Sequence, residues 1–300
     1  MSDLVEATEL ALGRDPPGAP GRAKGTLVRA LQLTRTRIGL GIVGVIVLVA
    51  LVGPYVAPHS PTAFVGAPFS PPTSGAPFGT DVLGRDVLSR FLCGGRSIIG
   101  LALAATLLGV GAGAAAGLTA ALRRGLTDDV VMRASDVLLA FPQIVLVLLL
   151  LSMAGTNLWL LVIAVALGHV PRTARVIRGA AFDVVESDFV KVAEMMGETR
   201  RRIVVDQLLP NVSSPLMVEL GLRLTYSIGL VAGMSFLGFG LQPPAADWGL
   251  MINENLVGLA GQPWGVALPI LAIALLTVGT NLVTDGVARA SIRIGSDSGS

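Results

Sequence analysis

Long uninterrupted apolar runs dominate the chain and predict membrane-spanning helices. A helix needs about 20 apolar residues to cross the hydrocarbon core of a bilayer. Four runs provide one span each: Ile38–Ala57, Ser97–Leu122, Leu216–Leu241 and Trp264–Val283. A further run, Val137–Gly168, has 32 residues without a charge. As a single helix it would be about 48 Å long, which exceeds one span, and Ala154-Gly155-Thr156-Asn157 near its middle has the composition of a turn.

The positions of the cationic side chains decide how often this run crosses the membrane. Lys and Arg gather in cytoplasmic loops, and here they concentrate in segments 1–37, 123–133, 172–202 and 289–293. An even number of spans must separate any two cytoplasmic segments, so two spans are expected within 137–171. We therefore predict six transmembrane helices with both termini inside. The five-span alternative would place the seven cations of segment 172–202 on the outer face.

This topology divides the chain into five parts. We expect residues 1–37 to form a cytoplasmic tail and 38–57 a first transmembrane helix, which begins too late for a cleavable signal peptide. Residues 58–96 are expected outside the membrane. Residues 97–285 would form a core of five more transmembrane helices with a cytoplasmic loop at about 172–214, and 286–300 a cytoplasmic tail.

The outer segment combines an extended part with a charged part. Six prolines between 58 and 77 favour extended chain, and from Asp86 onward the apolar spacing predicts a short helix lying along the membrane surface. Asp81, Arg85 and Asp86 could contact a partner outside the membrane. Helix capping and local ion pairs are the alternative for the same three residues.

Composition agrees with a lipid-embedded protein. Hydrophobic residues make up 52% of the chain and charged residues 14%, whereas soluble domains carry about 25% charged residues. The 37 glycines allow membrane helices to pack closely. Cys93 is the only cysteine, so an intrachain disulfide is excluded and the side chain is expected to fill space.

Ionisable side chains are scarce in the predicted spans, which disfavours a carrier driven by an ion gradient. Those near the spans are expected at helix ends: Asp136, His169, Glu219 and Asp285. Glu219 and Arg223 are four apart on a helix and should pair, with contact to a solute as the alternative. The chain has no GxxxxGK[ST], HExxH or CxxC pattern, so we expect neither ATP hydrolysis nor a metal site, and no catalytic residue.

The long cytoplasmic loop has the pattern of a docking surface. A short helix is predicted from Phe189 to Gly197, where glycine suits a left-handed C-terminal turn. Val190, Ala193 and Met196 would share its apolar side. A second stretch, Thr199–Leu209, carries three arginines and should end at Pro210. Before the loop, arginines at 172, 175 and 178 would meet lipid headgroups or a partner.

This loop resembles the EAA motif of ABC importer permeases, which reads E-A-A, three residues, G, about nine residues and I-x-L-P. The matching positions are Val192, Ala193, Gly197, Leu209, Pro210 and Asn211. Lys191 stands at the position of the motif glutamate, and Gln207 where histidine is frequent. Four more stretches, 79–90, 132–142, 235–249 and 263–286, resemble DppC/OppC-type permeases of the dipeptide/oligopeptide/nickel family, so the resemblance covers about residues 38–290 in register.

The resemblance implies an all-α fold, the six-helix transmembrane domain of a type I (MetI-like) ABC importer in the bacterial cytoplasmic membrane. It implies import of dipeptides or oligopeptides, with nickel chelates, glutathione or other small solutes as alternatives. It further implies a homologous second permease, two ATPase subunits that carry ATP and Mg²⁺, and an external substrate-binding protein. This chain itself would bind no cofactor and no nucleic acid, and its surroundings would be the lipid bilayer.

The same resemblance assigns ATPase coupling to ten residues of the loop. They are Phe189, Val190, Lys191, Val192, Ala193, Met196, Gly197, Ile203, Leu209 and Pro210. Because Lys191 reverses the charge of the motif glutamate, a membrane scaffold without transport activity is a further alternative. No residue is assigned to substrate contact.

Overall fold

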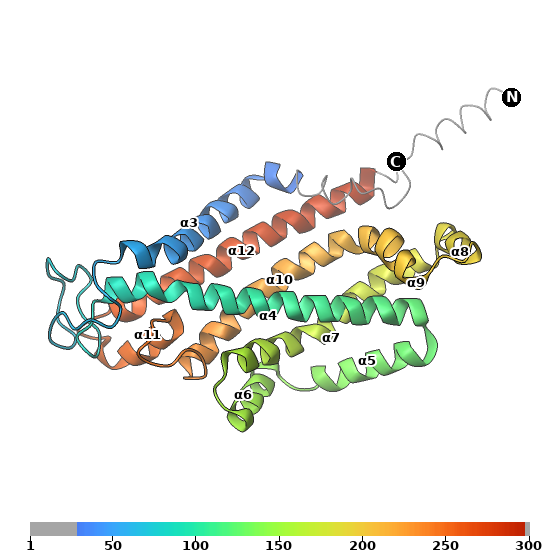
Figure 1. Ribbon diagram of the computed structural model, residues 1–300. Coiled ribbons are helices and arrows are strands. Elements are labelled where there is room, and N and C mark those ends of the chain that lie inside the picture. Colours follow the sequence, from blue (N-terminus) through green and yellow to red (C-terminus); the bar gives the residue numbers. More distant parts are fainter. Residues whose placement is uncertain (1–28, 298–300) are drawn as a thin grey trace.

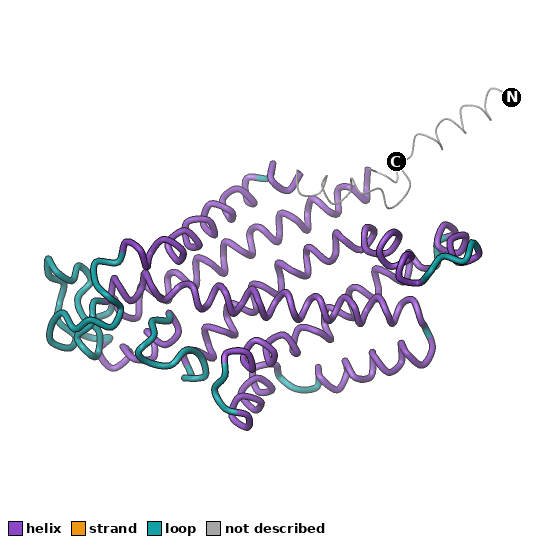
Figure 2. Tube along the Cα trace, in the orientation of Figure 1, coloured by secondary structure: helices purple, strands orange, loops and turns teal. Residues whose placement is uncertain are grey.

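The computed structural model describes residues 29–297, and this part of the chain consists of helices joined by loops (Figure 1, Figure 2). The long helices are α3 (Thr34–Val56), α4 (Val87–Arg123), α7 (Leu158–Val185), α10 (Leu209–Phe236) and α12 (Trp264–Asp297). The shorter ones are α5 (Gly125–Leu139), α6 (Gln143–Ala154), α8 (Asp188–Met195), α9 (Arg200–Arg202), the π-helical η1 (Ile203–Leu208), α11 (Trp248–Asn255) and the 3-10 helix η2 (Leu256–Gly258).

Within residues 29–297, five helices are long and apolar enough to cross a membrane, and a sixth span exists if the bent pair α5 and α6 counts as one. The pair turns by 85° between Leu139 and Gln143. Proline causes the break, because Pro142 restricts the residue before it to extended backbone. The expected all-α fold is confirmed, and the predicted number of six spans holds when the bent pair is counted.

The uncharged run 137–168 divides where its composition indicated. Gly155 adopts φ +89° and ends α6, and the Asn157 side chain accepts a hydrogen bond from the Trp159 amide at 2.8 Å to start α7. The first half of the run is shorter than a span, because α6 has only 12 residues. α5 completes it, and its acids are held by α7: Arg178 pairs with Asp128, and Arg175 with Asp136.

α4 corrects one expectation about the outer segment. A separate surface helix from Asp86 is wrong, since Val87 begins a single helix of 37 residues that continues to Arg123. Asp86 is its N-cap and accepts hydrogen bonds from the amides of Leu88 and Ser89. At about 1.5 Å per residue the helix is roughly 55 Å long, so it extends beyond a hydrocarbon core of about 30 Å.

α4 packs on α7 through three glycines at helical spacing. A Cβ atom at Gly109, Gly113 or Gly117 would lie 2.5–2.7 Å from a backbone oxygen of α7. Only glycine allows backbones to approach this closely. The glycine content noted in the sequence therefore serves helix packing along this pair.

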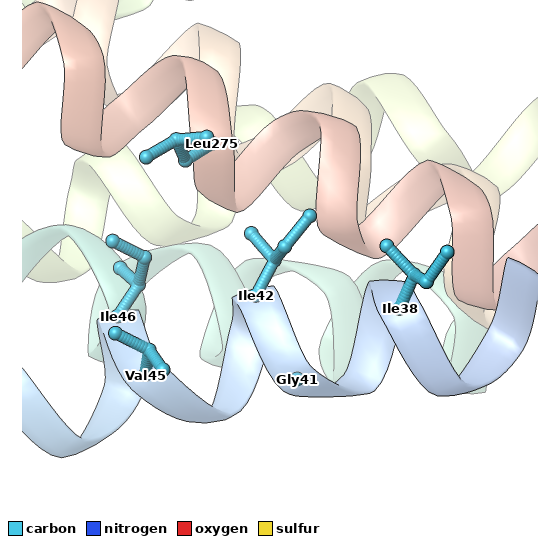
Figure 3. Close-up of a pocket in the computed structure, with 6 residues that line it drawn as sticks. All are labelled: Ile38, Gly41, Ile42, Val45, Ile46 and Leu275. Carbon is cyan, nitrogen blue, oxygen red and sulfur yellow. The ribbon is translucent and has the colours of Figure 1, made fainter.

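α3 lies against α12 at the edge of the bundle (Figure 1). A groove of about 370 Å³ runs along this face, lined by Ile38, Gly41, Ile42, Val45, Ile46 and Leu275 (Figure 3). Its lining side chains are apolar, so they offer a hydrophilic solute no hydrogen-bonding group in exchange for water. The groove therefore suits hydrocarbon chains and not a hydrophilic solute.

Candidate functional site

Residues 189–210, the predicted coupling segment, lie at the end of the bundle opposite α11 and the long loop before α4 (Figure 1). Its first helix, α8, ends in the predicted left-handed turn: Gly197 has φ +79°. The Glu198 amide donates to the Ala193 carbonyl at 3.0 Å, the long bond of a Schellman cap. Gly197 therefore sets the direction in which the chain leaves α8.

α8 has a buried side and an exposed side. Val190 and Ala193 pack into a cluster with Ile203 and Leu208 of η1 and with α4 and α7 side chains; we name it the inner core cluster: Leu118, Ala121, Ile177, Ala181, Val190, Ala193, Ile203 and Leu208. Val192, Met195 and Met196 are exposed, the two methionines by nearly 80%. The expectation that Met196 shares the side of Val190 is wrong, because α8 ends at Met195 and the chain turns at Gly197.

Lys191 and Arg202 of the segment lie at the surface and form exposed ion pairs. Lys191 lies 3.5 Å from Asp188, one turn earlier on the exposed side of α8. Arg202 pairs with Asp206 at 3.3 Å and with Glu198 at 3.8 Å. Such exposed pairs contribute little to stability, so these side chains remain available to a partner.

Pro210 corrects a second expectation. It does not end the second stretch, because the helix continues through it from Arg200 to Phe236. The turn before it is widened into the π-helix η1, and the amide of Leu209, the residue after η1, donates to the Val204 carbonyl. A proline ring normally clashes with the carbonyl four residues earlier, and the wider turn gives it room. A π segment of this kind often marks a functional site.

A buried polar cluster lies between α4, α6, α7 and α10, at some distance along the chain from the coupling segment. The Arg223 guanidinium donates to Glu219 at 3.0 Å, and the Thr173 hydroxyl donates to the same carboxylate at 3.0 Å. His169 and Thr106 both contact the Ser227 hydroxyl, at 2.8 and 2.9 Å. Arg172 donates to the side-chain amide oxygen of Gln143 at 2.7 Å.

This cluster confirms one prediction and corrects another. Glu219 and Arg223 pair as their spacing indicated. The expectation that His169 and Glu219 lie at helix ends is wrong, because both are buried near the middle of α7 and α10. The signal that could have located the cluster is the spacing of four in His169 with Thr173 and in Glu219, Arg223 and Ser227, which places each set on one helix face.

At the end of the bundle that the sequence predicts to lie outside, four charged residues form the outer charge cluster: Asp81, Arg85, Arg90 and Glu254. Asp81 accepts from Arg85 at 2.6 Å and from Arg90 at 2.5 Å, and Glu254 of α11 accepts from both arginines at 3.1 and 2.7 Å. The side chains of the first three are almost fully buried. Local ion pairing and the Asp86 cap are therefore present, while contact with an outside partner stays a prediction.

Asp247 and Trp248 join α11 to α4 beside this cluster. Asp247 caps α11 and accepts from the Ser97 hydroxyl at 2.5 Å. The Trp248 indole donates to the Phe91 carbonyl at 2.9 Å and stacks on the Phe91 ring. Burial raises the pKa of the Asp247 carboxyl, and the hydrogen bonds it accepts act in the opposite direction.

With the helices, the glycine-ended α8 and the π turn before Pro210 established, comparison with known proteins identifies the family. Residues 95–293, about two thirds of the chain, match the family described as binding-protein-dependent transport system inner membrane component. The chain belongs to this family. The permease is thus a transport component of the ABC class in a bacterial inner membrane, where it works in a complex with other subunits.

Individual relatives match between about three quarters and nearly all of the chain. A protein named as a peptide transport system permease of Brucella suis is 32% identical over 96% of both chains. The oligopeptide transport system permease protein of Bacillus subtilis is 30% identical over 89% of this chain and 88% of its own. A glutathione transport system permease protein of Pectobacterium atrosepticum is 35% identical over 73% of both.

Proposed function

We propose that the permease is the membrane subunit of an ATP-driven importer of dipeptides or oligopeptides and forms half of the translocation pathway. The observation that carries this proposal is the two-sided α8: Val190 and Ala193 fix it to the inner core cluster, while Val192, Met195 and Met196 are left uncovered. Relatives named as peptide and oligopeptide permeases supply the solute class.

The proposed complex contains four kinds of subunit. A homologous second permease closes the pathway, and two ATPase subunits hold ATP and Mg²⁺ and grip the coupling segment. A substrate-binding protein delivers the solute at the outer side, where Asp81, Arg85 and Asp86 would support the docking surface. The permease itself is a non-catalytic subunit, and it binds no cofactor in this proposal.

Both termini lie in the cytoplasm in this arrangement. The coupling segment must then face the cytoplasm, and residues 58–86 with α11 the outside. The arginines of α7 follow the positive-inside rule even though Arg175 and Arg178 are paired with α5. A cysteine-reactive, membrane-impermeant label should reach a Val257→Cys variant in intact spheroplasts and a Met195→Cys variant only in inverted vesicles, both with Cys93 replaced.

The mechanism follows from how α8 is held. When the ATPase pair closes on ATP, it moves the exposed side of α8. Val190 and Ala193 transmit that movement to Ile203 and Leu208, and through the inner core cluster to the ends of α4 and α7. Since η1 continues into α10, three spans receive the movement together and can change which side of the pathway is open.

Other solutes and other energy sources are outcomes of the test. Glutathione is a peptide derivative, and one relative is named for it. The scarcity of ionisable side chains in the spans disfavours an ion-coupled carrier, but Glu219 is an acid buried within α10 and weakens this argument. Its carboxylate is nonetheless occupied by Arg223 and Thr173, which leaves no free acid there to carry a proton.

The test is performed on the complete complex, purified in mild detergent and reconstituted into vesicles. We expect ATP-dependent uptake of labelled peptides in the presence of the binding protein. Replacing Met195 and Met196 together by glutamate should release the ATPase subunits during purification. The matched control is Val257→Glu, at an equally exposed apolar residue of the opposite end. Retained ATPase in the methionine variant, or uptake driven by an ion gradient without ATP, would contradict the proposal.

A further inference from the structure

One face of α10 passes from the buried polar cluster to open surface: Arg223 is 8% exposed, whereas Tyr226 beside it is uncovered. The Arg223 guanidinium lies over the Tyr226 ring, 5.5 Å from its centre. Tyr226 is 56% exposed, and no residue between 29 and 297 hydrogen-bonds to its hydroxyl. This pair stands near the middle of a helix that is long and apolar enough to cross the membrane.

Arg223 is held in place with donors to spare. Its Nε and Nη2 atoms donate to the two oxygens of Glu219, at 3.0 and 3.3 Å. Thr173 of α7 holds that carboxylate from the other side. A guanidinium has five N–H donors in a fixed plane, and Nη1 has no acceptor within the described residues. The side chain is therefore fixed in orientation yet still able to bind an oxygen atom.

The next two turns of the same face are open. A Cβ atom added to Gly229 or Gly233 would meet no heavy atom within 4 Å. Residues 226, 229 and 233 follow the three-and-four spacing of one helix face, so bare backbone lies directly beyond the tyrosine. Such a surface admits the close approach of another chain's main-chain atoms.

We propose that this pathway face, Arg223, Tyr226, Gly229 and Gly233, lines the route of the solute and binds the carbonyl or carboxylate oxygens of a peptide in transit. This inference rests on the proposed function. A charged and an aromatic polar side chain near the middle of a span face a solute route far more readily than lipid. Because Glu219 already neutralises Arg223, the contact is weak enough for the peptide to leave, as transport requires.

A packing surface for another helix is the competing use of the two glycines, since their spacing is also that of close helix pairs. Such a helix would have to cover the exposed tyrosine and leave the spare donors of Arg223 without acceptors. An aqueous peptide supplies those acceptors. The two uses differ in whether water reaches Gly229 in the assembled transporter.

The first experiment measures that access. In a Cys93→Ser background, Gly229→Cys and the control Gly44→Cys are compared within the reconstituted complex; Gly44 of α3 is equally open in the structure. A water-soluble thiol reagent should modify the Gly229→Cys variant, and a transported peptide should slow that reaction by about tenfold. The control should not react. No reaction at position 229, or a rate that peptide leaves unchanged, would overturn the inference.

A second variant separates blockage from disassembly. Gly229→Leu should lower peptide uptake by about tenfold, because it narrows the route, while the second permease and the ATPase subunits still copurify. Full uptake by this variant, or loss of the second permease from the complex, would refute the pathway face. If the unmodified complex itself takes up no peptide, the proposed function fails instead.

Discussion

Gly197 adopts a left-handed backbone conformation that residues with a side chain adopt only at a cost. A Cβ atom there would meet nothing within 4 Å, so only its φ of +79° resists substitution. Left-handed backbone costs a residue with a side chain roughly 1–2 kcal/mol. We expect Gly197→Ala to loosen the end of α8 and to lower peptide-stimulated ATP hydrolysis several-fold, and Gly197→Asn to have a smaller effect.

The matched control for this prediction is Gly179→Ala. Gly179 is equally uncrowded, has ordinary helical backbone in α7 and lies outside the coupling segment. Alanine favours a helix over glycine, so hydrolysis should stay unchanged. Equal rates for Gly197→Ala and the parent complex would show that the turn does not matter for coupling.

The Glu219–Arg223 pair depends on both partners being present, because its charges are buried. Removing one partner of a buried pair leaves an uncompensated charge and costs about 3–5 kcal/mol, whereas replacing both costs far less. We expect Glu219→Gln to lower the melting temperature of the purified permease more than the double variant Glu219→Gln, Arg223→Gln does. The cycle is completed by the single variant Arg223→Gln. If the losses in melting temperature of the two single variants added up in the double variant, the two side chains would not interact.

Residues of this kind set the limit of sequence reasoning. The Gly197 turn and the Glu219–Arg223 pair were predictable because each depends on neighbours in the chain. The burial of His169 was not predictable, since its partners Ser227 and Gln143 come from other helices. The sequence around a histidine in an apolar run does not indicate which hydroxyl on another helix will hydrogen-bond to it.

At the scale of elements, α5 is the helix whose position depends most on charge. Arg178 of α7 holds Asp128 through two hydrogen bonds of 2.5 Å, and Arg175 holds Asp136. Since these pairs are partly exposed, each is worth about 1 kcal/mol or less. We expect Asp128→Asn to speed hydrogen exchange of the α5 amides a few-fold and to leave α10 unchanged. Unchanged exchange in α5 would assign its docking to apolar contacts instead.

The elements that sequence patterns misjudged share one physical cause. The hydropathy pattern indicates the apolar runs, but it does not indicate that α4 begins ten residues before the apolar run that starts at Ser97, with Asp86 as its N-cap. It also does not indicate that the helical turn before Pro210 is the wider π-helix η1. Caps and π turns are hydrogen-bond geometries, and their side chains look like loop residues when only their polarity is considered.

At the scale of the molecule, α4 connects the two ends of the bundle. Near its start, Arg90 belongs to the outer charge cluster and Phe91 stacks on Trp248 of α11. Near its end, Leu118 and Ala121 belong to the inner core cluster. A closely packed α4–α7 pair lies between, where Gly109 and Gly113 bring the backbones together. If α8 transmits movement as proposed, this pair of helices is the continuous path from α8 to the opposite end of the bundle.

The proposed function assigns ATPase binding to the exposed side of α8 and transmission of the movement to its buried side, and a Val190 variant tests this division. Val190 is buried beneath α8 and contributes nothing to its exposed side. Val190→Ser should weaken the attachment of α8 to the inner core cluster, because it removes apolar atoms and leaves a hydroxyl to be satisfied. The ATPase subunits should still copurify, since Met195 and Met196 are untouched, but peptide should no longer stimulate ATP hydrolysis.

The comparison that decides is with the double methionine variant, in which binding of the ATPase itself should be lost. If Val190→Ser lost the ATPase as well, binding of the ATPase and transmission of its movement would depend on the same residues of α8. If it kept both ATPase and stimulated hydrolysis, the movement would have to enter the membrane elsewhere, through Arg200 to Asp206 and η1. Only one outcome for Val190→Ser agrees with the proposed mechanism: the ATPase stays bound, and peptide no longer stimulates hydrolysis. In that mechanism the buried side of α8 attaches it to the inner core cluster, and the ATPase moves its exposed side.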